Sequence, residues 1–398
     1  MKICIAGKNN IAIDVCSYLL KTYDKNKICV IVNQTDTGEN SFQRSFLFYA
    51  KQQGLEITHL ENVYDIEDLL FISLEFDKII RPAKFKSKRL FNIHFSLLPK
   101  YKGMYTSALP LLYGETETGV TLHTIDRGID TGDIIAQKKI KIKQTDNAKN
   151  IYLKYIENGT ELVIKQIDKL ISNTFISKKQ PSINSTYFSK QTLNYQNLIV
   201  DLNVTAFQLE RQIKAFCFRD YQIATVHGYK IIDTKILKKK SQAKPGTIIN
   251  DYEDKIVIST IDYDIELIKD QFDLILDCCK RDNISKLKEI KIKQYLEEKN
   301  KYGWTPLIVA TYNNSKQVFH YLLSEGADIN AINNNGTSLL MYAKDAALLH
   351  KDKELLDYIL TNNGNIYYRD YFGKNILDYL ETQSSELFNY IKHHDKIS

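Results

Sequence analysis

Short apolar runs alternate with helix-spaced apolar residues at the start of this chain. Residues 2–6 and 28–32 form two such runs, and Ile11, Val15 and Leu19 recur between them at the spacing of a helix. Strands that alternate with helices pack as a mainly parallel, doubly wound sheet, because each connecting helix covers a face of that sheet. We therefore expect an α/β fold at the N-terminal end.

The first turn of this fold, residues 7–10, lacks the GxGxxG pattern of nicotinamide dinucleotide sites. Exposed backbone amides at the start of a helix can still hold a phosphate. Lys8 and Asn9 at this turn, and Lys102 further on, are therefore candidate contacts for a phosphate or a sugar. The alternative for each of them is a solvated surface position.

The middle of the chain changes to a β-rich pattern. After a predicted helix over residues 151–172, the polar stretch 172–189 has the composition of a linker. A second helix is expected over residues 205–215. Short alternating apolar segments then run from 227 to 268, which predicts a small β-rich module.

The last 130 or so residues contain an internal repeat. Gly303-Trp-Thr-Pro-Leu recurs as Gly336-Thr-Ser-Leu-Leu and Gly373-Lys-Asn-Ile-Leu, at spacings of 33 and 37 residues. This pattern resembles the ankyrin repeat, and residues 326–330 (Gly-Ala-Asp-Ile-Asn) match the turn after its second helix. The resemblance implies an all-α tail, with residues 271–297 as its N-terminal cap.

Length and charge agree with three domains. The 398 residues exceed what one hydrophobic core usually supports, and we expect domains at 1–200, 201–269 and 270–398. The first 269 residues carry 38 basic and 30 acidic side chains, and the rest carry 16 and 18. This mild positive charge suits an anionic small molecule rather than nucleic acid.

Other patterns narrow the class of protein. No apolar run is long enough to span a membrane and no signal peptide is expected at the start of the sequence. The six cysteines lie in or beside apolar segments without metal-ligand spacing, so we expect no metal site and a reducing, cytoplasmic location.

Two polar motifs carry the chemistry. Residues 91–103 contain Asn92 and His94 at the end of an apolar strand, and strand geometry places both on one face. Residues 119–135 contain Asp126 and Asp130 in a glycine-rich loop between two apolar segments. A satisfied core histidine and a solvated turn are the alternatives for either motif taken alone.

Together the motifs resemble the folate-dependent formyltransferases, over about the first 200 residues. The resemblance implies a Rossmann-like catalytic domain in which Asn92, His94 and Asp130 are catalytic and 10-formyltetrahydrofolate is the formyl donor. Either His94 or Asp130 would be the base that removes the proton of the attacking amine. It also implies that the pteridine lies between two loops, here represented by Ile79, Ile80, Arg81, Pro82, Asp126 and Ile129.

Residues 213–224 look like the substrate-contacting segment of the sugar-nucleotide formyltransferases. Phe218 and Tyr221 are candidates to stack on a base, and Arg219 is a candidate to pair with a phosphate; packing in a core is the alternative for each. The implied reaction formylates the amino group of a dTDP-linked 3-amino-3,6-dideoxyhexose for lipopolysaccharide O-antigen synthesis. A 4-amino-4,6-dideoxy sugar, hydrolysis of 10-formyltetrahydrofolate and a catalytically silent scaffold are the alternatives.

Two expectations concern partners. The family resemblance implies a homodimer formed through the β-rich module. In the tail, Trp304 follows the repeat's glycine at a position where the other copies have Thr337 and Lys374, which favours an exposed side chain. Trp304 and Tyr302 together are therefore a candidate second ligand site or a candidate surface for a protein partner. The alternative is that this turn position tolerates any residue and Trp304 has no binding role.

Overall fold

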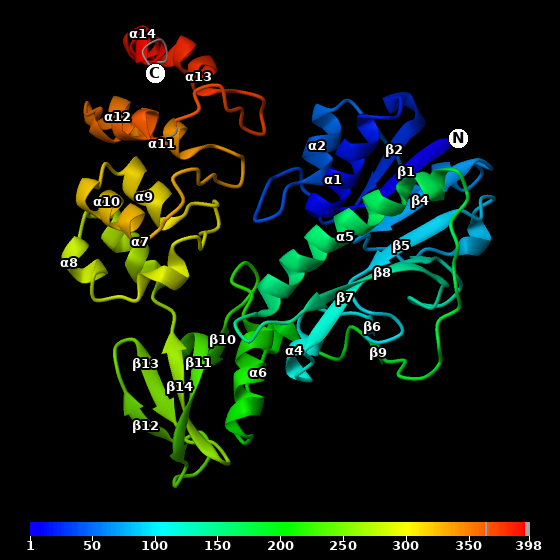
Figure 1. The fold of residues 1–398 in the computed structure, drawn as a ribbon, viewed down its shortest axis with the longest axis horizontal. Helices are drawn as coiled ribbons and strands as arrows, with labels where there is room; N and C mark the ends of the chain where they lie inside the picture. The colour runs from blue at the N-terminus through cyan, green and yellow to red at the C-terminus, as the bar shows by residue number, and fades with distance from the viewer. Residues whose placement is uncertain (363, 395–398) are drawn as a thin grey trace. The chain divides into compact units, whose positions relative to one another are not determined.

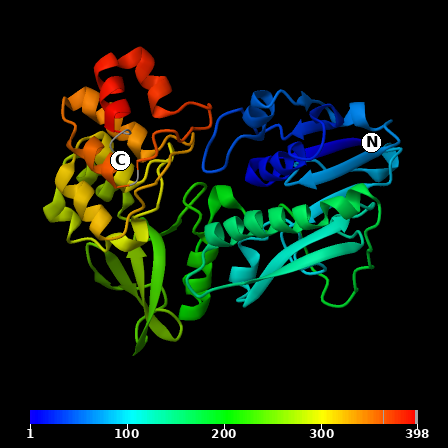
Figure 2. The same ribbon diagram turned by 45° about the horizontal axis from the view of Figure 1, so that its top comes forward.

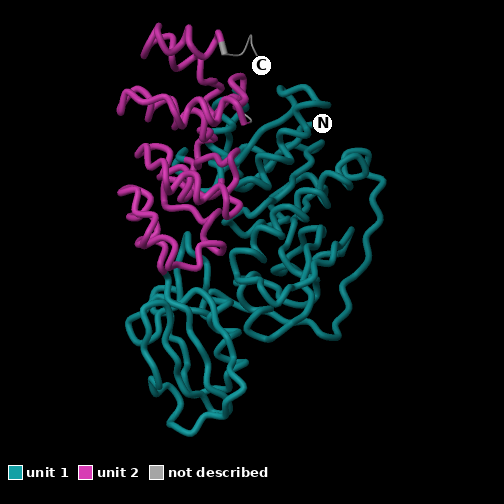
Figure 3. Tube along the Cα trace, turned by 60° about the vertical axis from the view of Figure 1, so that its left-hand side comes forward, with its two compact units in different colours: residues 1–39, 44–270 teal, residues 40–43, 271–398 magenta. Residues whose placement is uncertain are grey.

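The structure is a computed structural model that describes residues 1–362 and 364–394. The chain forms two compact units (Figure 3). Unit 1 comprises residues 1–39 and 44–270, and unit 2 comprises residues 40–43 and the chain from Gln271 onward.

A seven-stranded sheet in the order β3-β2-β1-β4-β5-β7-β8 forms the centre of unit 1 (Figure 1). The first five strands of that order run parallel, and β7 and β8 add antiparallel strands at one edge. This confirms the expected mainly parallel α/β sheet. The strands are β1 (Lys2–Gly7), β2 (Ile28–Val32), β3 (Glu56–Ile57), β4 (Leu69–Leu74), β5 (Leu90–His94), β7 (Glu117–Thr124) and β8 (Ile134–Lys141).

Helices connect these strands, and α5 packs against α1, β7 and β8 (Figure 2). The helices of this part are α1 (Asn9–Leu20), α2 (Phe46–Gln52), α3 (Leu60–Val63), α4 (Leu109–Leu112) and α5 (Ala148–Ile171). Short 3-10 helices are η1 (Lys25–Lys27), η2 (Pro82–Lys84), η3 (Tyr195–Asn197) and, in unit 2, η4 (Ile292–Tyr295). No helix in the described residues is long and apolar enough to cross a membrane.

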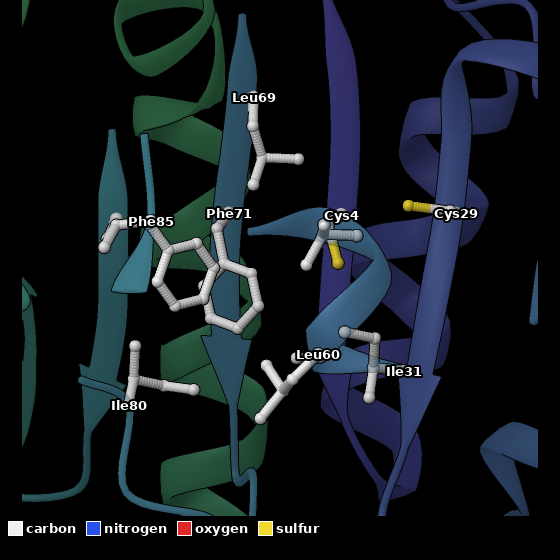
Figure 4. Close-up of a cluster of buried hydrophobic side chains, with 11 residues drawn as sticks. Cys4, Cys29, Ile31, Leu60, Leu69, Phe71, Ile80 and Phe85 are labelled. Carbon is white, nitrogen blue, oxygen red and sulfur yellow. The ribbon is translucent and has the colours of Figure 1, made fainter. Parts of the chain in front are cut away.

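Buried side chains at every second strand position build one face of the core (Figure 4). Cys4, Cys29, Ile31 and Phe71 alternate with residues of the opposite face, as strand geometry requires. All six cysteines are buried and free. The expectation that they are small core residues is confirmed.

The second sheet of unit 1 has five antiparallel strands in the order β10-β11-β14-β13-β12. They are β10 (Ala224–Val226), β11 (Tyr229–Lys240), β12 (Ile248–Asp251), β13 (Lys255–Ile258) and β14 (Tyr263–Lys269). Helix α6 (Ala206–Phe216) packs against β11 and β14. It begins at a capping box in which the side chain of Thr205 accepts a bond from the Gln208 amide. The predicted β-rich module is confirmed.

The stretch 172–189 does not behave as the linker that its composition suggested. Within it, β9 (Tyr187–Phe188) pairs with β6 (Lys102–Gly103), and Lys178 forms a bridge with Ile134. Polar composition misled the prediction, because polar side chains of this stretch, those of Gln180 and Thr186, bond to backbone atoms of other loops.

Unit 2 is a stack of helices with a repeated turn. The helices are α7 (Phe272–Lys280), α8 (Ile284–Leu287), α9 (Pro306–Tyr312), α10 (Lys316–Ser324), α11 (Leu339–His350), α12 (Glu354–Thr361), α13 (Ile376–Gln383) and α14 (Ser385–His394). The three repeated glycines all have positive φ, between 75° and 80°. In each copy an Asn or Asp three residues before the glycine accepts two backbone amides, which fixes the same turn three times.

Candidate active site

Strand β5 ends with two polar side chains on one face. Asn92 and His94 are separated by a single residue, so they share that face. In the antiparallel pairing with β7, Asn92 lies opposite His123 and His94 lies opposite Thr121. Both histidines are buried, so the end of β5 carries polar groups that water hardly reaches.

Asp130 joins these side chains from the loop between β7 and β8. Its Oδ2 accepts a hydrogen bond from the Gly103 amide at 2.9 Å and lies 3.4 Å from Nδ1 of His94. Its Oδ1 lies 3.5 Å from Nδ2 of Asn92 and 3.7 Å from Nε2 of His123. The structure thus brings together the three residues expected to be catalytic.

The protein fixes the orientation of the His94 ring. Nε2 lies 2.7 Å from the carbonyl oxygen of Tyr101. A carbonyl only accepts, so this partner assigns the hydrogen to Nε2 and leaves Nδ1 facing Asp130. Burial lowers the pKa of His94 below its ordinary value of 6.5 and outweighs the opposing effect of Asp130. Nδ1 is therefore unprotonated at neutral pH and available to take up a proton.

Asp130 remains ionised throughout the physiological range. Burial alone would raise its pKa, but His94, His123 and the Gly103 amide outweigh burial and hold the pKa at about 2. At the low pH where Asp130 takes up its proton, His94 is already protonated. Its positive charge therefore lowers the pKa of Asp130 even though burial lowers the pKa of His94 itself. The carboxylate is a fixed negative charge beside Nδ1.

His123 is a member of the site that the sequence did not reveal. Its Nδ1 lies 2.7 Å from the Thr124 carbonyl oxygen, which assigns a hydrogen to Nδ1. Its Nε2 then accepts a hydrogen bond from Nδ2 of Asn92 at 3.1 Å. His123 therefore orients the Asn92 amide. His123 could be found only from the antiparallel register of β5 and β7, which pairs it with Asn92. No local sequence pattern shows that register.

The two loops expected to hold a pteridine border the same apolar cluster. Ile80 belongs to it, and Ile125, the first residue of the Asp130 loop, packs against it. Ile79 is 71% exposed and Ile129 is 39% exposed. Each of the two loops therefore presents an uncovered apolar side chain.

The remaining residues of those loops are on the surface. Arg81 is exposed, and Pro82 begins η2. Asp126 is exposed, and its Oδ1 accepts bonds from the Gly128 amide at 3.0 Å and from the Thr131 hydroxyl at 2.6 Å. The carboxylate of Asp126 thus shapes its own loop, so backbone groups are what this loop offers a ligand.

Asn9 lies in a polar group at the carboxyl ends of β1 and β4. Its Nδ2 lies 2.8 Å from the Tyr152 hydroxyl and 3.2 Å from Oε2 of Glu75. The Tyr152 hydroxyl donates to the same carboxylate oxygen at 2.9 Å. Burial raises the pKa of Glu75. Glu75 and Tyr152 were missed because they are far from Asn9 in sequence.

The two lysines predicted as ligand contacts have different surroundings. Lys8 is half-buried, and its charge acts on Glu75 in the group around Asn9. Lys102, on β6, donates from Nζ to the Ser185 hydroxyl at 3.1 Å. Lys102 directly precedes Gly103, whose backbone amide donates a hydrogen bond to Asp130.

In the segment after α6, two of the predicted substrate-contact residues have partners within the protein. Phe218 is only 4% exposed and packs against Tyr152, so its ring is a core element. Arg219 forms a two-pronged ion pair with Asp270, at 2.7 Å and 2.9 Å, which occupies the guanidinium. The pairing joins residues 51 apart, so sequence alone could not show it. Tyr221 is 62% exposed and contacts Phe218.

In unit 2, Trp304 is half-buried, whereas an exposed side chain was expected. Its ring lies 5.3 Å from Tyr312 and 5.1 Å from Tyr342, and 6.5 Å from the exposed ring of Tyr302. The repeat's turn directs this position toward neighbouring helices. The expectation failed because variation among three copies does not measure exposure.

The described residues contain no group of His, Cys, Asp or Glu side chains arranged to hold a metal ion. The cluster at the end of β5 instead offers an oriented amide donor, an imidazole nitrogen that can accept a proton and a carboxylate beside it. These groups suit transfer of an acyl or formyl group to a nucleophile.

Comparison with known proteins agrees with this chemistry. Residues 30–167 match the family model for formyl transferase, and residues 192–274 match the model for its C-terminal domain. Among solved structures, WlaRD, a sugar 3N-formyl transferase, is 42% identical to this chain. The similarity covers 68% of this chain and 97% of WlaRD, with a TM-score of 0.63. The chain belongs to the sugar N-formyltransferase family.

A second member of the family gives a matching result. The N-formyltransferase from Helicobacter canadensis, solved with folinic acid and dTDP-3-aminofucose, is 41% identical, with a TM-score of 0.64. The similarity covers 68% of this chain and all of that one. Residues 275–370 match the model for three ankyrin repeats, which confirms the predicted repeat in this sugar N-formyltransferase.

Methionyl-tRNA formyltransferases are more distant relatives of this sugar N-formyltransferase. The Staphylococcus epidermidis enzyme is 28% identical over 216 residues, which is 53% of this chain and 69% of that enzyme. The Nitrosospira multiformis enzyme is 31% identical over 170 residues, 42% of this chain and 54% of that enzyme.

Proposed function

We propose that the protein transfers the formyl group of 10-formyltetrahydrofolate to the amino group of a dTDP-linked 3-amino-3,6-dideoxyhexose. The convergence of Asn92, His94 and Asp130 carries the proposal. The identity to WlaRD, described in the presence of dTDP and 5-N-formyl-tetrahydrofolate, supports the choice of both substrates. Synthesis of a lipopolysaccharide O-antigen sugar in the cytoplasm is part of this proposal.

The reaction exchanges one bond for another. The sugar's amine nitrogen bonds to the formyl carbon, the bond from that carbon to N10 of the folate breaks, and a proton from the amine ends on N10. Negative charge develops on the formyl oxygen. Nδ2 of Asn92 donates one hydrogen to His123, and its second hydrogen, which faces Oδ1 of Asp130 at a long 3.5 Å, is the one available to that oxygen. One such donor contributes roughly 3 to 4 kcal/mol to the transition state.

His94 is the base in this proposal. Nδ1 is unprotonated at neutral pH because burial lowers its pKa, and the ionised Asp130 stabilises the imidazolium that forms when Nδ1 accepts the amine's proton. Since Nε2 already donates to Tyr101, Nδ1 is the nitrogen that changes its protonation state.

Substrate contacts follow from the exposed and half-buried groups around this centre. The pteridine lies against Ile79 and Ile129 and bonds to loop backbone. The nucleotide sugar contacts Lys8, Asn9, Lys102 and Tyr221, and Tyr221 offers an exposed ring for stacking on the base.

The experiment that tests this function offers the purified protein 10-formyltetrahydrofolate with dTDP- and UDP-linked 3-amino and 4-amino sugars, one at a time. We expect the dTDP-linked 3-amino sugar to gain one CO, detected by mass, with equal release of tetrahydrofolate. Preference for a 4-amino sugar would correct the substrate. Folate turnover without any sugar would show a hydrolase.

Outside the catalytic centre, we propose domains at 1–200, 201–269 and 270–398 and a homodimer formed through the β-rich module. Light scattering of the purified protein tests the dimer. We also propose that Tyr302 and Trp304 mark an interaction surface on the ankyrin repeats. Two molecules of dTDP-sugar bound per chain, falling to one in Trp304→Ala, would identify a second ligand site. One molecule bound in both proteins would favour a protein partner.

A further inference from the structure

Residues 178–188, here called the strap, run beside both loops of the proposed active site. At one end, Lys178 exchanges two backbone hydrogen bonds with Ile134, at 2.8 Å and 2.9 Å. At the other end, Tyr187 and Phe188 pair with β6. The polar composition that suggested a linker therefore belongs to a segment held against the catalytic domain.

Gln180, within the strap, bonds to the backbone of the Asp130 loop. Its Nε2 donates to the carbonyl oxygen of Asp130 and to that of Gly132, both at 2.8 Å. An amide nitrogen has two hydrogens, so both are used. The opposite orientation of the amide would place Oε1 against two carbonyl oxygens, which fixes the assignment.

The loop that Gln180 holds has an unusual backbone. Asp130 has φ of +54°, a left-handed conformation that residues other than glycine rarely adopt. A Cβ at Gly132 would lie 1.7 Å from the Thr124 carbonyl oxygen, so the loop is also closely packed at that point. Such conformations persist where the surroundings over-determine them, and Gln180 supplies two of the bonds that do so.

The strap also holds the opposite loop. The Tyr101 amide donates to the Thr186 hydroxyl at 2.7 Å, and Gly103 pairs with Phe188. Tyr101 carries the carbonyl that accepts from His94, and Gly103 carries the amide that donates to Asp130. One segment therefore bonds to the backbone on both sides of the pair His94 and Asp130.

We propose that Gln180 is a positioning residue for formyl transfer, which holds the backbone of Asp130 so that its carboxylate faces His94. The proposal rests on the proposed function, because it assigns a role in that reaction. Gln180 touches no reacting atom and acts through Asp130. Misplacement of a reacting group by about 1 Å can cost on the order of 10²-fold in rate.

The experiment compares Gln180→Met with wild type. Methionine keeps the length and packing of glutamine but cannot donate either hydrogen bond. Lys179→Ala is the matched control, because Lys179 is an exposed neighbour in the same strap. For each protein we would measure kcat, the Kd for the dTDP-linked aminosugar, the melting temperature and hydrogen exchange of the peptide covering residues 126–133.

We expect kcat of Gln180→Met to fall between tenfold and on the order of 10²-fold, with the Kd for the sugar unchanged within twofold and faster exchange of that peptide. Lys179→Ala should match wild type throughout. A wild-type kcat in Gln180→Met, or a loss explained by unfolded protein, overturns the positioning role. If the wild type transfers no formyl group, the proposed function fails. Separately, if hydrogen exchange of the peptide covering residues 126–133 is unchanged in Gln180→Met, then Gln180 does not hold the backbone of Asp130.

Discussion

Nδ1 of His94 lies 3.4 Å from Oδ2 of Asp130. This separation is long for a hydrogen bond between an imidazole and a carboxylate. A proton on Nδ1 would convert it into a charge-assisted bond, and catalytic contacts commonly tighten only when the substrate is bound. In the proposed reaction, the pair therefore holds a proton on Nδ1 during formyl transfer rather than before it.

Replacing Asp130 with asparagine keeps the side chain's shape but removes its charge. We expect kcat to fall on the order of 10²- to 10⁴-fold, the usual contribution of acid and base groups, because an imidazolium at His94 loses its counter-charge. Steady-state formylation measures the effect. Asp65→Asn, at an exposed surface position, is the control. Asp130→Asn with more than half of wild-type activity would remove Asp130 from the mechanism.

The titration of His94 has a predicted direction. Burial lowers its pKa, so its NMR titration should have a midpoint below 6.5, and kcat/KM should fall as pH drops through that midpoint. Asp130 acts in the raising direction, so Asp130→Asn should move the midpoint to still lower pH. A midpoint at or above 6.5, or an upward shift in the variant, would contradict the assigned environment.

His123 should affect catalysis through Asn92. His123→Ala removes the 3.1 Å acceptor of Asn92 Nδ2 and leaves it Oδ1 of Asp130 at 3.5 Å, and we expect kcat to fall about tenfold. Asn92→Ala removes the proposed oxyanion donor itself and should lower kcat on the order of 10²- to 10³-fold. His59, an exposed histidine, gives the control variant His59→Ala. Equal losses in the His123 and Asn92 variants would argue against this division of roles.

The Asp130 loop should tolerate little added volume at Gly132. In Gly132→Ala the new Cβ meets the Thr124 backbone, whereas in Gly128→Ala it meets the Thr131 side chain, which can rotate with the loss of its hydrogen bond to Asp126. We expect Gly132→Ala to lower the free energy of unfolding by about 1–3 kcal/mol and Gly128→Ala by less. Chemical denaturation measures both. The reverse order would show that the loop relaxes freely.

Much of the architecture could be predicted from local patterns. The apolar runs at residues 2–6 and 28–32 lie within β1 and β2, and the repeated glycines mark the ankyrin turns. Asn92 and His94 share a face because strands have a period of two, and the glycine-rich loop returns Asp130 to them. These features depend on neighbours in sequence or on one recognisable motif.

The rest depends on contacts between distant residues. His123 accepts a hydrogen bond from Asn92 because of the strand register. Arg219 pairs with Asp270, which is 51 residues away in sequence. Gln180 donates to the Asp130 carbonyl from a segment with the composition of a linker. A sequence pattern reports how polar a segment is but not which backbone groups it satisfies. The supporting residues of the site therefore became visible only in the fold.

The central claim is that Asn92, His94 and Asp130 direct a formyl group to the amine of a dTDP-linked sugar. The most direct test follows isotope-labelled formyl from 10-formyltetrahydrofolate in the presence of dTDP-3-amino-3,6-dideoxyhexose. We predict that the wild type places the label in a sugar amide and that His94→Ala, shown to be folded, does not. Label released as formate by the wild type, or full transfer by His94→Ala, would contradict the account.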